Sequence, residues 1–160
     1  MLRSFLLTFL LCGALSFAQE VKIIPQPVQL KKNSGSFVIN SQTKLVVANK
    51  ENEATATFLN KYLADYYGFK LQIVKKADKN SIEFKSLKNI EGLKSESYSL
   101  KSNEEGVVIE GNSPTGTFYG MQTLIQLLPV EKSNSLKIAS VEVKDGPRFA
   151  YRGAMLDVGR

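Results

Sequence analysis

The stretch SPTGTFYGMQTLIQLLP, residues 113–129, carries the strongest local signal in the chain. Ser113 is a preferred helix N-cap, and Pro114 suits the first helical position, where its missing N–H is not needed. Pro129 ends the pattern. Between them the apolar side chains recur at helical spacing: Phe118, Met121, Leu124, Ile125 and Leu128. The stretch therefore predicts an amphipathic helix whose apolar face packs in a core and does not hold a cofactor.

A second helix is predicted over residues 52–67. Its acidic first turn, with Glu51 and Glu53, suits a helix N-terminus, and Gly68 suits the left-handed position that follows a helix. Aromatic side chains recur every four residues and lie beside two leucines, so they predict one buried stripe: Phe58, Tyr62 and Tyr66, with Leu59 and Leu63.

Short β-branched and aromatic runs predict strands around these helices. Residues 98–101 and 107–110 bracket SNEEG, residues 102–106, which is typical of a hairpin. Residues 37–39, 44–47, 70–74, 81–84 and 136–144 predict further strands, while 21–30 reads as extended chain and 31–35 as a turn. Together these elements predict an α+β fold: a mostly antiparallel sheet with two helices on one face.

The first eighteen residues have the three parts of a secretory signal. A short basic start with Arg3 precedes an apolar run from Phe5 to Leu15, and small residues precede the expected cleavage after Ala18. The run has about eleven residues, too few to span a bilayer as a helix. Cys12, the only cysteine, lies in this run and would leave with the signal. We expect a secreted or periplasmic protein without disulfides.

Composition narrows the chemistry. Apolar residues make up 43% and charged residues 22% of the chain, which is the balance of a globular protein. The net charge is +6, but the lysines are dispersed among acids, which argues against nucleic acid as a partner. The chain has no histidine or tryptophan, so histidine-based catalysis and the common zinc sites are excluded, and no cofactor is expected. The closest acidic pair, Glu104-Glu105, falls in the predicted hairpin turn and is expected to be solvated.

Residues 148–160, RFAYRGAMLDVGR, follow a predicted turn at Asp145-Gly146-Pro147 and read as the start of a second domain. The nearly continuous apolar core at 154–158 is typical of a strand buried on both faces. The charges in and beside it, Arg148, Arg152, Asp157 and Arg160, either line a polar cleft or pair with one another between two domains, because unpaired burial is costly.

Four segments in this order resemble glycoside hydrolase family 20, the β-N-acetylhexosaminidases: IIPQP at 23–27, GTFYGMQTLIQLL at 116–128, DGPRF at 145–149 and YRGAMLDVGR at 151–160. The resemblance implies a signal peptide (1–18), an accessory α+β domain (19–147) and the first strand of a truncated (β/α)8 barrel (148–160). It also implies a secreted exo-acting enzyme that removes terminal N-acetylglucosamine or N-acetylgalactosamine from glycans with retention, using the substrate's own acetamido oxygen.

The resemblance assigns one site residue. Arg152 matches the family arginine that binds hydroxyls of the terminal sugar, and its planar fork suits two neighbouring hydroxyls. Asp157 and Arg160 are expected to support the strand end. The catalytic Asp-Glu pair of the family is expected beyond Arg160, so this chain alone should be inactive and should hold no metal.

Two alternatives remain open at this point. The chain could be a free-standing secreted carbohydrate-binding or scaffold module, which an exposed aromatic platform would favour. It could also be the accessory domain of another glycosidase, because such domains precede other barrels too.

Overall fold

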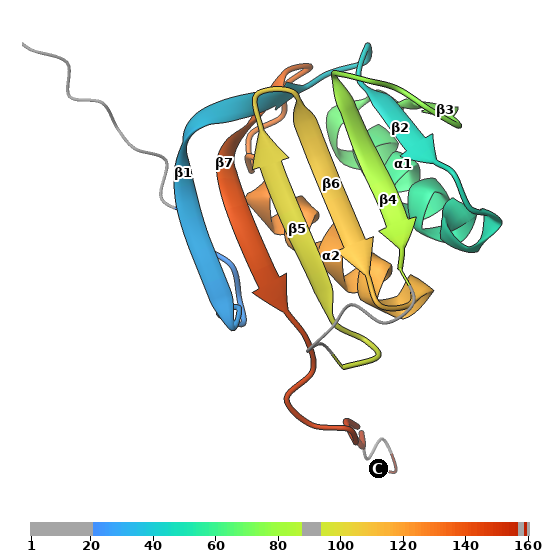
Figure 1. Ribbon diagram of the computed structural model, residues 1–160, viewed down its shortest axis with the longest axis vertical. Coiled ribbons are helices and arrows are strands. Elements are labelled where there is room, and N and C mark those ends of the chain that lie inside the picture. The colour runs from blue at the N-terminus through green and yellow to red at the C-terminus, as the bar shows by residue number, and fades with distance from the viewer. Residues whose placement is uncertain (1–20, 88–93, 157–158, 160) are drawn as a thin grey trace, which may run out of the picture.

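The computed structural model describes residues 21–87, 94–156 and 159 (Figure 1). The expected signal peptide, residues 1–18, lies outside the described residues. The elements, in chain order, are β1 (Gln29–Ile39), β2 (Lys44–Val47), a 3₁₀ turn (Lys50–Asn52), α1 (Glu53–Tyr67), β3 (Gln72–Val74), β4 (Ser81–Ser86), β5 (Tyr98–Asn103), β6 (Gly106–Gly111), α2 (Pro114–Leu127) and β7 (Leu136–Asp145).

The described strands form one seven-stranded sheet in the order β1-β7-β5-β6-β4-β2-β3, and both helices lie behind it in Figure 1. Two helices on one face of a single sheet confirm the α+β prediction. The expectation of a mostly antiparallel sheet is wrong. The pairs β1–β7, β7–β5 and β5–β6 are antiparallel, but β6–β4, β4–β2 and β2–β3 are parallel. Helix α1 provides the crossover that a parallel β2–β3 pair requires.

Helix α2 forms as its sequence predicts. The Ser113 hydroxyl accepts a hydrogen bond of 3.2 Å from the backbone N–H of Gly116, which satisfies one free donor of the first turn. Met121 and Leu124 are fully buried, and Leu127 and Leu128 are nearly so. The helix packs mainly on β6 and β5, so its apolar face covers the centre of the sheet.

Helix α1 ends at Tyr67 as predicted but begins one residue later than predicted, at Glu53, and Gly68 follows it with φ of 81° in the left-handed region. The predicted buried stripe is wrong in part. Leu59 and Leu63 are buried as expected, but the Phe58 side chain is 45% and Tyr66 56% exposed. The stripe that faces the core contains Thr55, Ala56, Leu59, Leu63 and Tyr67, one helical step round from the predicted one.

The turn predicted at residues 31–35 is a β-bulge. Strand β1 runs through this segment, and its register against β7 shifts between Lys32 and Ser36. Gly35 lies inside the shift with φ of +95°, a conformation that glycine adopts without steric cost. The glycine and serines that resemble a turn in sequence therefore bend the strand and do not end it.

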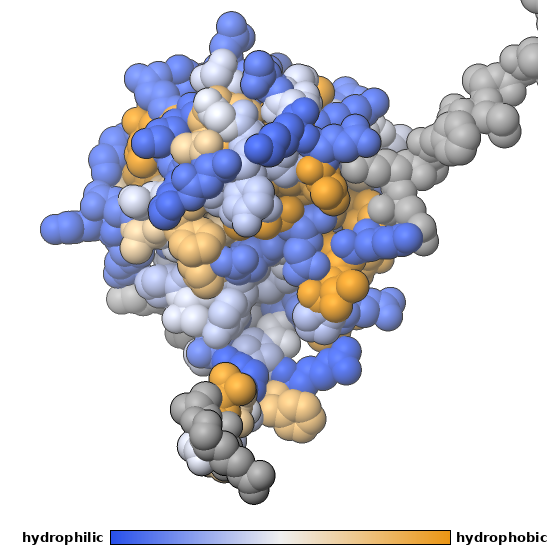
Figure 2. Space-filling model, turned by 180° about the vertical axis from the view of Figure 1, so that it is seen from behind, coloured by the Kyte–Doolittle hydropathy of each residue, from blue (hydrophilic) through white to orange (hydrophobic). Residues whose placement is uncertain are grey.

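One hydrophobic core joins the helices to the sheet. Its largest fully buried side chains are Phe84, Ile39, Leu45, Leu59, Leu63, Ile82, Leu100, Ile109, Met121, Leu124, Leu136 and Ile138. On the face of the molecule that carries the helices, opposite to the face seen in Figure 1, hydrophobic patches lie among mainly hydrophilic side chains (Figure 2). There the exposed Phe58 ring meets Phe118 edge-to-face at 5.4 Å, and Tyr62 stacks on Tyr66 at 4.5 Å. Aromatic rings on the two helices thus pack on one another at the surface.

The segment after β7 leaves the domain without joining its sheet (Figure 1). Residues 151–156 belong to no strand in the structure, and Tyr151, Met155 and Leu156 are 91%, 94% and 86% exposed. The strand expected from Tyr151 onward is therefore not formed in the described part of that segment. A strand is defined by its hydrogen bonds to a neighbouring strand, and no strand of the described residues lies beside residues 151–156.

Candidate functional site

The best candidate site lies where the chain leaves β7, because the one assigned residue, Arg152, folds back there. Asp145 ends the strand, and its carboxylate accepts a 3.2 Å hydrogen bond from the backbone N–H of Val28. This bond ties the exit of the chain to the segment that enters β1. The entry to β1 and the exit from β7 are therefore held together at one end of the sheet.

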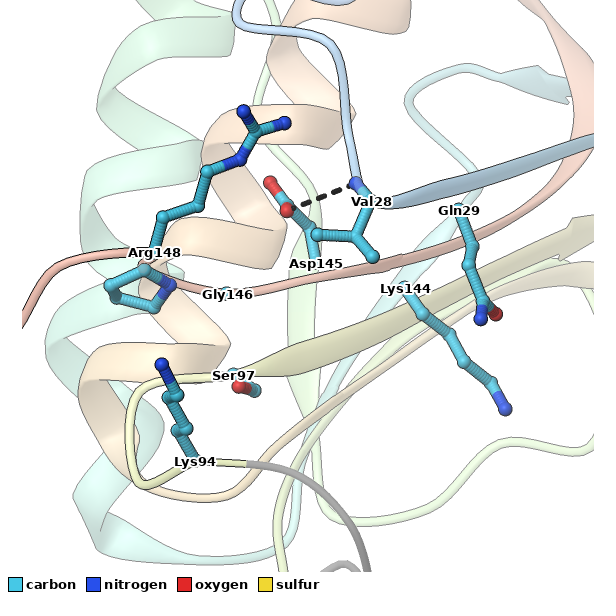
Figure 3. Close-up of a pocket in the computed structure, with 9 residues that line it drawn as sticks. Val28, Gln29, Lys94, Ser97, Lys144, Asp145, Gly146 and Arg148 are labelled. Carbon is cyan, nitrogen blue, oxygen red and sulfur yellow. Dashed lines mark hydrogen bonds between the residues drawn. The ribbon is translucent and has the colours of Figure 1, made fainter.

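A pocket of about 360 Å³ opens at this exit (Figure 3). Asp145 and Gly146 form one wall, and three cationic side chains surround it: Lys94, Lys144 and Arg148. In Figure 3 the Lys144 and Arg148 side chains extend away from each other. The Lys144 and Arg148 charges therefore do not converge on one point in this pocket.

Arg152 lies beside this exit and is held by three hydrogen bonds. Its Nη2 donates to Glu96 Oε2 at 2.5 Å and to the Tyr119 hydroxyl at 3.4 Å. Its Nη1 donates to the backbone carbonyl of Phe149 at 2.7 Å. Glu96 immediately precedes the Ser97 that leads into β5, and Tyr119 lies in α2. Side chains before β5 and in α2 therefore hold Arg152, which follows β7, against the end of the sheet.

The ion pair is accessible to solvent. The Arg152 and Glu96 side chains are 42% and 35% exposed. The hydrogen bond to Glu96, and next the one to Tyr119, raise the pKa of the Arg152 guanidinium above its ordinary value. The arginine is therefore always protonated, and its charge is balanced by one carboxylate.

A second pocket, of about 600 Å³, has Arg152 in its lining. Tyr98 and Tyr119 contribute from the domain, Pro25 and Gln26 from the N-terminal segment, and Asp145 to Arg148 from the exit. Its volume is within the range of ligand sites in proteins. Arg152 thus lines a pocket at this end of the domain, and two nitrogens of its guanidinium already donate hydrogen bonds to Glu96, Tyr119 and the Phe149 carbonyl.

The other charged residues that the sequence analysis considered are not placed beside Arg152. Glu104 and Glu105 lie in the turn between β5 and β6, where Glu105 pairs with Lys79 at 3.0 Å with both side chains well exposed, as expected for a solvated turn. Asp157 and Arg160 lie outside the described residues. Within residues 21–87 and 94–156 no three acidic, histidine or cysteine side chains are grouped as metal ligands would be. No helix in that part of the chain is long and apolar enough to cross a membrane.

Sequence reasoning missed both side-chain partners of Arg152, which are Glu96 and Tyr119. Tyr119 lies within the segment that carries the family resemblance, so it could have been noticed there. Nothing in the sequence marks Glu96, which is 56 residues from the arginine. Only the pairing of β5 with β7 brings the approach to β5 next to the chain exit.

A comparison with protein families decides the assignment of this fold. Residues 20–146 match the family described as "Glycosyl hydrolase family 20, domain 2". The chain belongs to glycoside hydrolase family 20. The matched region ends at Gly146, directly after β7, so the sheet and both helices are domain 2 of the family and Arg152 follows it.

Relatives that are named β-hexosaminidases agree with this assignment. The β-hexosaminidase of Porphyromonas gingivalis (strain ATCC BAA-308 / W83) is 40% identical over 151 residues, which cover 90% of this chain and 19% of that protein. The β-hexosaminidase of Vibrio furnissii is 27% identical over 143 residues, 89% of this chain and 22% of that protein. The chain thus spans about a fifth of the length of these relatives.

A solved structure from the same family has a similar fold. The family 20 β-N-acetylhexosaminidase of Streptomyces coelicolor A3(2) superposes with a TM-score of 0.76 at 30% identity, over 86% of this chain and 29% of that one. The exo β-N-acetylglucosaminidase of Vibrio harveyi, solved in complex with N-acetylglucosamine, gives a TM-score of 0.70 at 26% identity, over 81% and 20% of the two chains.

Proposed function

We propose that this chain is the N-terminal part of a secreted, exo-acting β-N-acetylhexosaminidase. The full enzyme would hydrolyse terminal N-acetylglucosamine or N-acetylgalactosamine from glycans with retention, and the acetamido oxygen of the substrate would act as nucleophile. The observation that carries the proposal is the match of residues 20–146 to domain 2 of glycoside hydrolase family 20. The β-hexosaminidase from P. gingivalis, at 40% identity over 90% of the chain, supports it.

In this proposal the chain has three parts with different roles. Residues 1–18 direct export, to the periplasm or outside the cell. Residues 19–147 form the accessory domain, which stabilises the enzyme without taking part in the chemistry. Residues 148–160 begin the catalytic (β/α)8 barrel, in which Arg152 binds sugar hydroxyls.

The first experiment is to sequence the coding DNA past the Arg160 codon, express the full product and assay it. We expect release of nitrophenol from nitrophenyl β-N-acetylglucosaminide and nitrophenyl β-N-acetylgalactosaminide. Proton NMR should show that the sugar is released first as the β-anomer. The polypeptide 19–160 alone is the matched control and should release none.

Other outcomes separate the alternatives. A stop codon directly after Arg160, with a folded and inactive product, would favour the free-standing binding or scaffold module. A full product that cleaves a different glycoside, and neither N-acetylhexosaminide, would identify the accessory domain of another glycosidase. Both results would contradict the proposed activity.

A further inference from the structure

We propose that the edge of β3 and the neighbouring side of α1 form a docking groove for an extended, acidic peptide segment of a partner protein. Strand β3 ends the sheet, and among the described residues β2 is its only strand neighbour (Figure 1). An edge strand has backbone N–H and C=O groups that can pair with a further strand. The inference is independent of the glycosidase activity proposed above.

The hydrogen bonds of Asn60 show which side of this edge is open. Its Oδ1 accepts a hydrogen bond of 2.8 Å from the Leu71 N–H, and its Nδ2 donates to the Leu71 carbonyl at 2.9 Å. Asn60 lies on α1, and Leu71 directly precedes β3. One side-chain amide therefore pairs with Leu71 in the way that a residue of a neighbouring strand would.

Ile73 continues this line of backbone groups. In extended chain the N–H and C=O of one residue point to the same side, and the side alternates from each residue to the next. Ile73 lies two residues after Leu71, so its N–H and C=O point to the side on which Asn60 pairs with Leu71. The backbone of Ile73 is therefore the next position at which an added strand can pair.

A pocket of about 500 Å³ lies between this edge and α1. Thr57, Asn60 and Ala64 line it from the helix, and Ile73 lines it from the strand. The Ile73 side chain is 48% exposed, although Leu45, its partner on β2, is fully buried. Directly paired side chains lie on the same face of a sheet, so the helix side of the sheet is covered at β2 and partly open at β3. An apolar side chain of an added strand would cover Ile73.

The charge around the groove favours an acidic occupant. Lys70 lines the pocket, and Lys75 and Lys76 directly follow β3. All three are exposed and form no ion pair within residues 21–87 and 94–156. Asp65, the carboxylate in the pocket, already pairs with Lys61 at 2.6 Å. Lysines on an edge disfavour pairing with a second copy, which brings the same charges, but they attract carboxylates.

The test is a titration of a fluorescein-labelled hexapeptide of alternating glutamate and valine with the full expressed product, followed by fluorescence anisotropy. The matched control ligand is the hexapeptide of alternating lysine and valine. We expect the acidic peptide to bind and the basic peptide not to bind. The Kd of the acidic peptide should rise as salt increases from about 50 to about 500 mM, because exposed charges are screened.

Two variants locate the bound peptide. Lys70→Glu should raise the Kd about fivefold or more, the effect of losing one exposed ion pair, while Lys137→Glu, at an exposed lysine of β7, should leave it unchanged. Ile73→Pro removes the N–H of the open edge, a position at which strands tolerate proline, and should abolish binding. The melting temperature of each variant shows whether it is folded, and Lys70→Glu tests the groove even if Ile73→Pro unfolds.

Several results would overturn the inference. Absence of binding by the acidic peptide, or equal binding by both peptides, contradicts an acidic partner. A Kd unchanged by Lys70→Glu places the peptide elsewhere. An unliganded full product whose Ile73 amide resists hydrogen exchange, and which binds no peptide, has its edge covered by a later part of its own chain. A dimer in sedimentation velocity that Ile73→Pro dissociates identifies a second copy as the occupant. Glycosidase activity enters none of these outcomes, so the proposed function is tested separately.

Discussion

Gly146 lies so close to Ser97 that a methyl group on its α-carbon would overlap the Ser97 hydroxyl oxygen, and would also meet Ser97 Cβ at 2.9 Å. Ser97, which directly precedes β5, is buried beside the chain exit from β7. The absence of a side chain at Gly146 therefore lets the exit pass against the domain end, next to the pocket lined by Arg148 and Asp145.

This contact predicts that Gly146→Ala lowers the free energy of unfolding by about 1–3 kcal/mol, the usual cost of overpacking a filled site. Urea unfolding followed by circular dichroism measures it. Gly153→Ala is the control, because its added methyl would lie 3.4 Å from the nearest atom, the Tyr151 hydroxyl, in ordinary contact. Equal stability of the two variants would show that Ser97 moves aside at little cost.

Ser102 replaces missing backbone hydrogen bonds where β5 and β7 part. Its buried hydroxyl donates to the Ala139 carbonyl at 2.8 Å and accepts from the Val141 N–H at 2.9 Å. Ser102→Ala would leave both backbone groups buried and unpaired, so we expect a loss of about 2–4 kcal/mol in unfolding free energy.

Chemical denaturation of Ser102→Ala beside Ser99→Ala tests this. Ser99 makes only a 3.4 Å bond to Glu110 and is partly exposed, so its variant should stay within about 0.5 kcal/mol of the wild type. If the Ser102 variant were as stable as the Ser99 variant, water would be reaching β7 at this point.

We predict that ionisation of the Tyr98 phenol lowers the free energy of unfolding at high pH. Burial raises its pKa to about 12, although the 2.5 Å hydrogen bond to Thr123 acts in the opposite direction. Below pH 10 the phenol is protonated in both the folded and unfolded states, so its contribution is fully present. Between about pH 10 and 12 the unfolded state releases the proton first, and about 2–3 kcal/mol of stability is lost as the pH rises.

Urea unfolding of the wild type and Tyr98→Phe at pH 9 and pH 11.5 checks the sign. The variant should be less stable at pH 9, since it lacks the hydroxyl, but should lose less stability between the two pH values. Parallel losses in both proteins would mean that Tyr98 does not titrate differently on folding.

Gln126 ties the N-terminal segment to α2. Its amide accepts from the Ile24 N–H at 2.8 Å and donates to the Ile24 carbonyl at 3.0 Å. We expect Gln126→Ala to speed amide hydrogen exchange in residues 21–28 and to lower the unfolding free energy by about 1 kcal/mol, because both bonds are near the surface. Gln122→Ala, one helical turn earlier, is the control and should leave that exchange unchanged.

The local elements could be predicted because their causes lie close together in the chain. Ser113, Pro114 and the apolar period define α2, Gly68 ends α1, and the SNEEG turn joins β5 to β6. Each signal acts over a few residues, through capping, allowed φ values or side-chain period.

The pairing of the strands and the buried face of α1 could not be predicted in the same way. Leu45 and Ile82 lie on short β-branched strands that could pair in either direction, yet they are partners in a parallel ladder. Tyr66 and Tyr67 are adjacent aromatic residues of α1, and only the packing of the helix against the sheet and α2 buries Tyr67 and exposes Tyr66. Such choices depend on which distant surfaces meet.

The sequence by itself determined the two helices, the hairpin, most strands and the resemblance to glycoside hydrolase family 20, because these depend on local physics and ordered motifs. Only the tertiary structure decided the mixed sheet, the bulge at Gly35 and the contact of Arg152 with Glu96. That contact joins groups 56 residues apart. Long-range pairing is the sum of many weak contacts across the whole fold, so no short stretch of the chain records it.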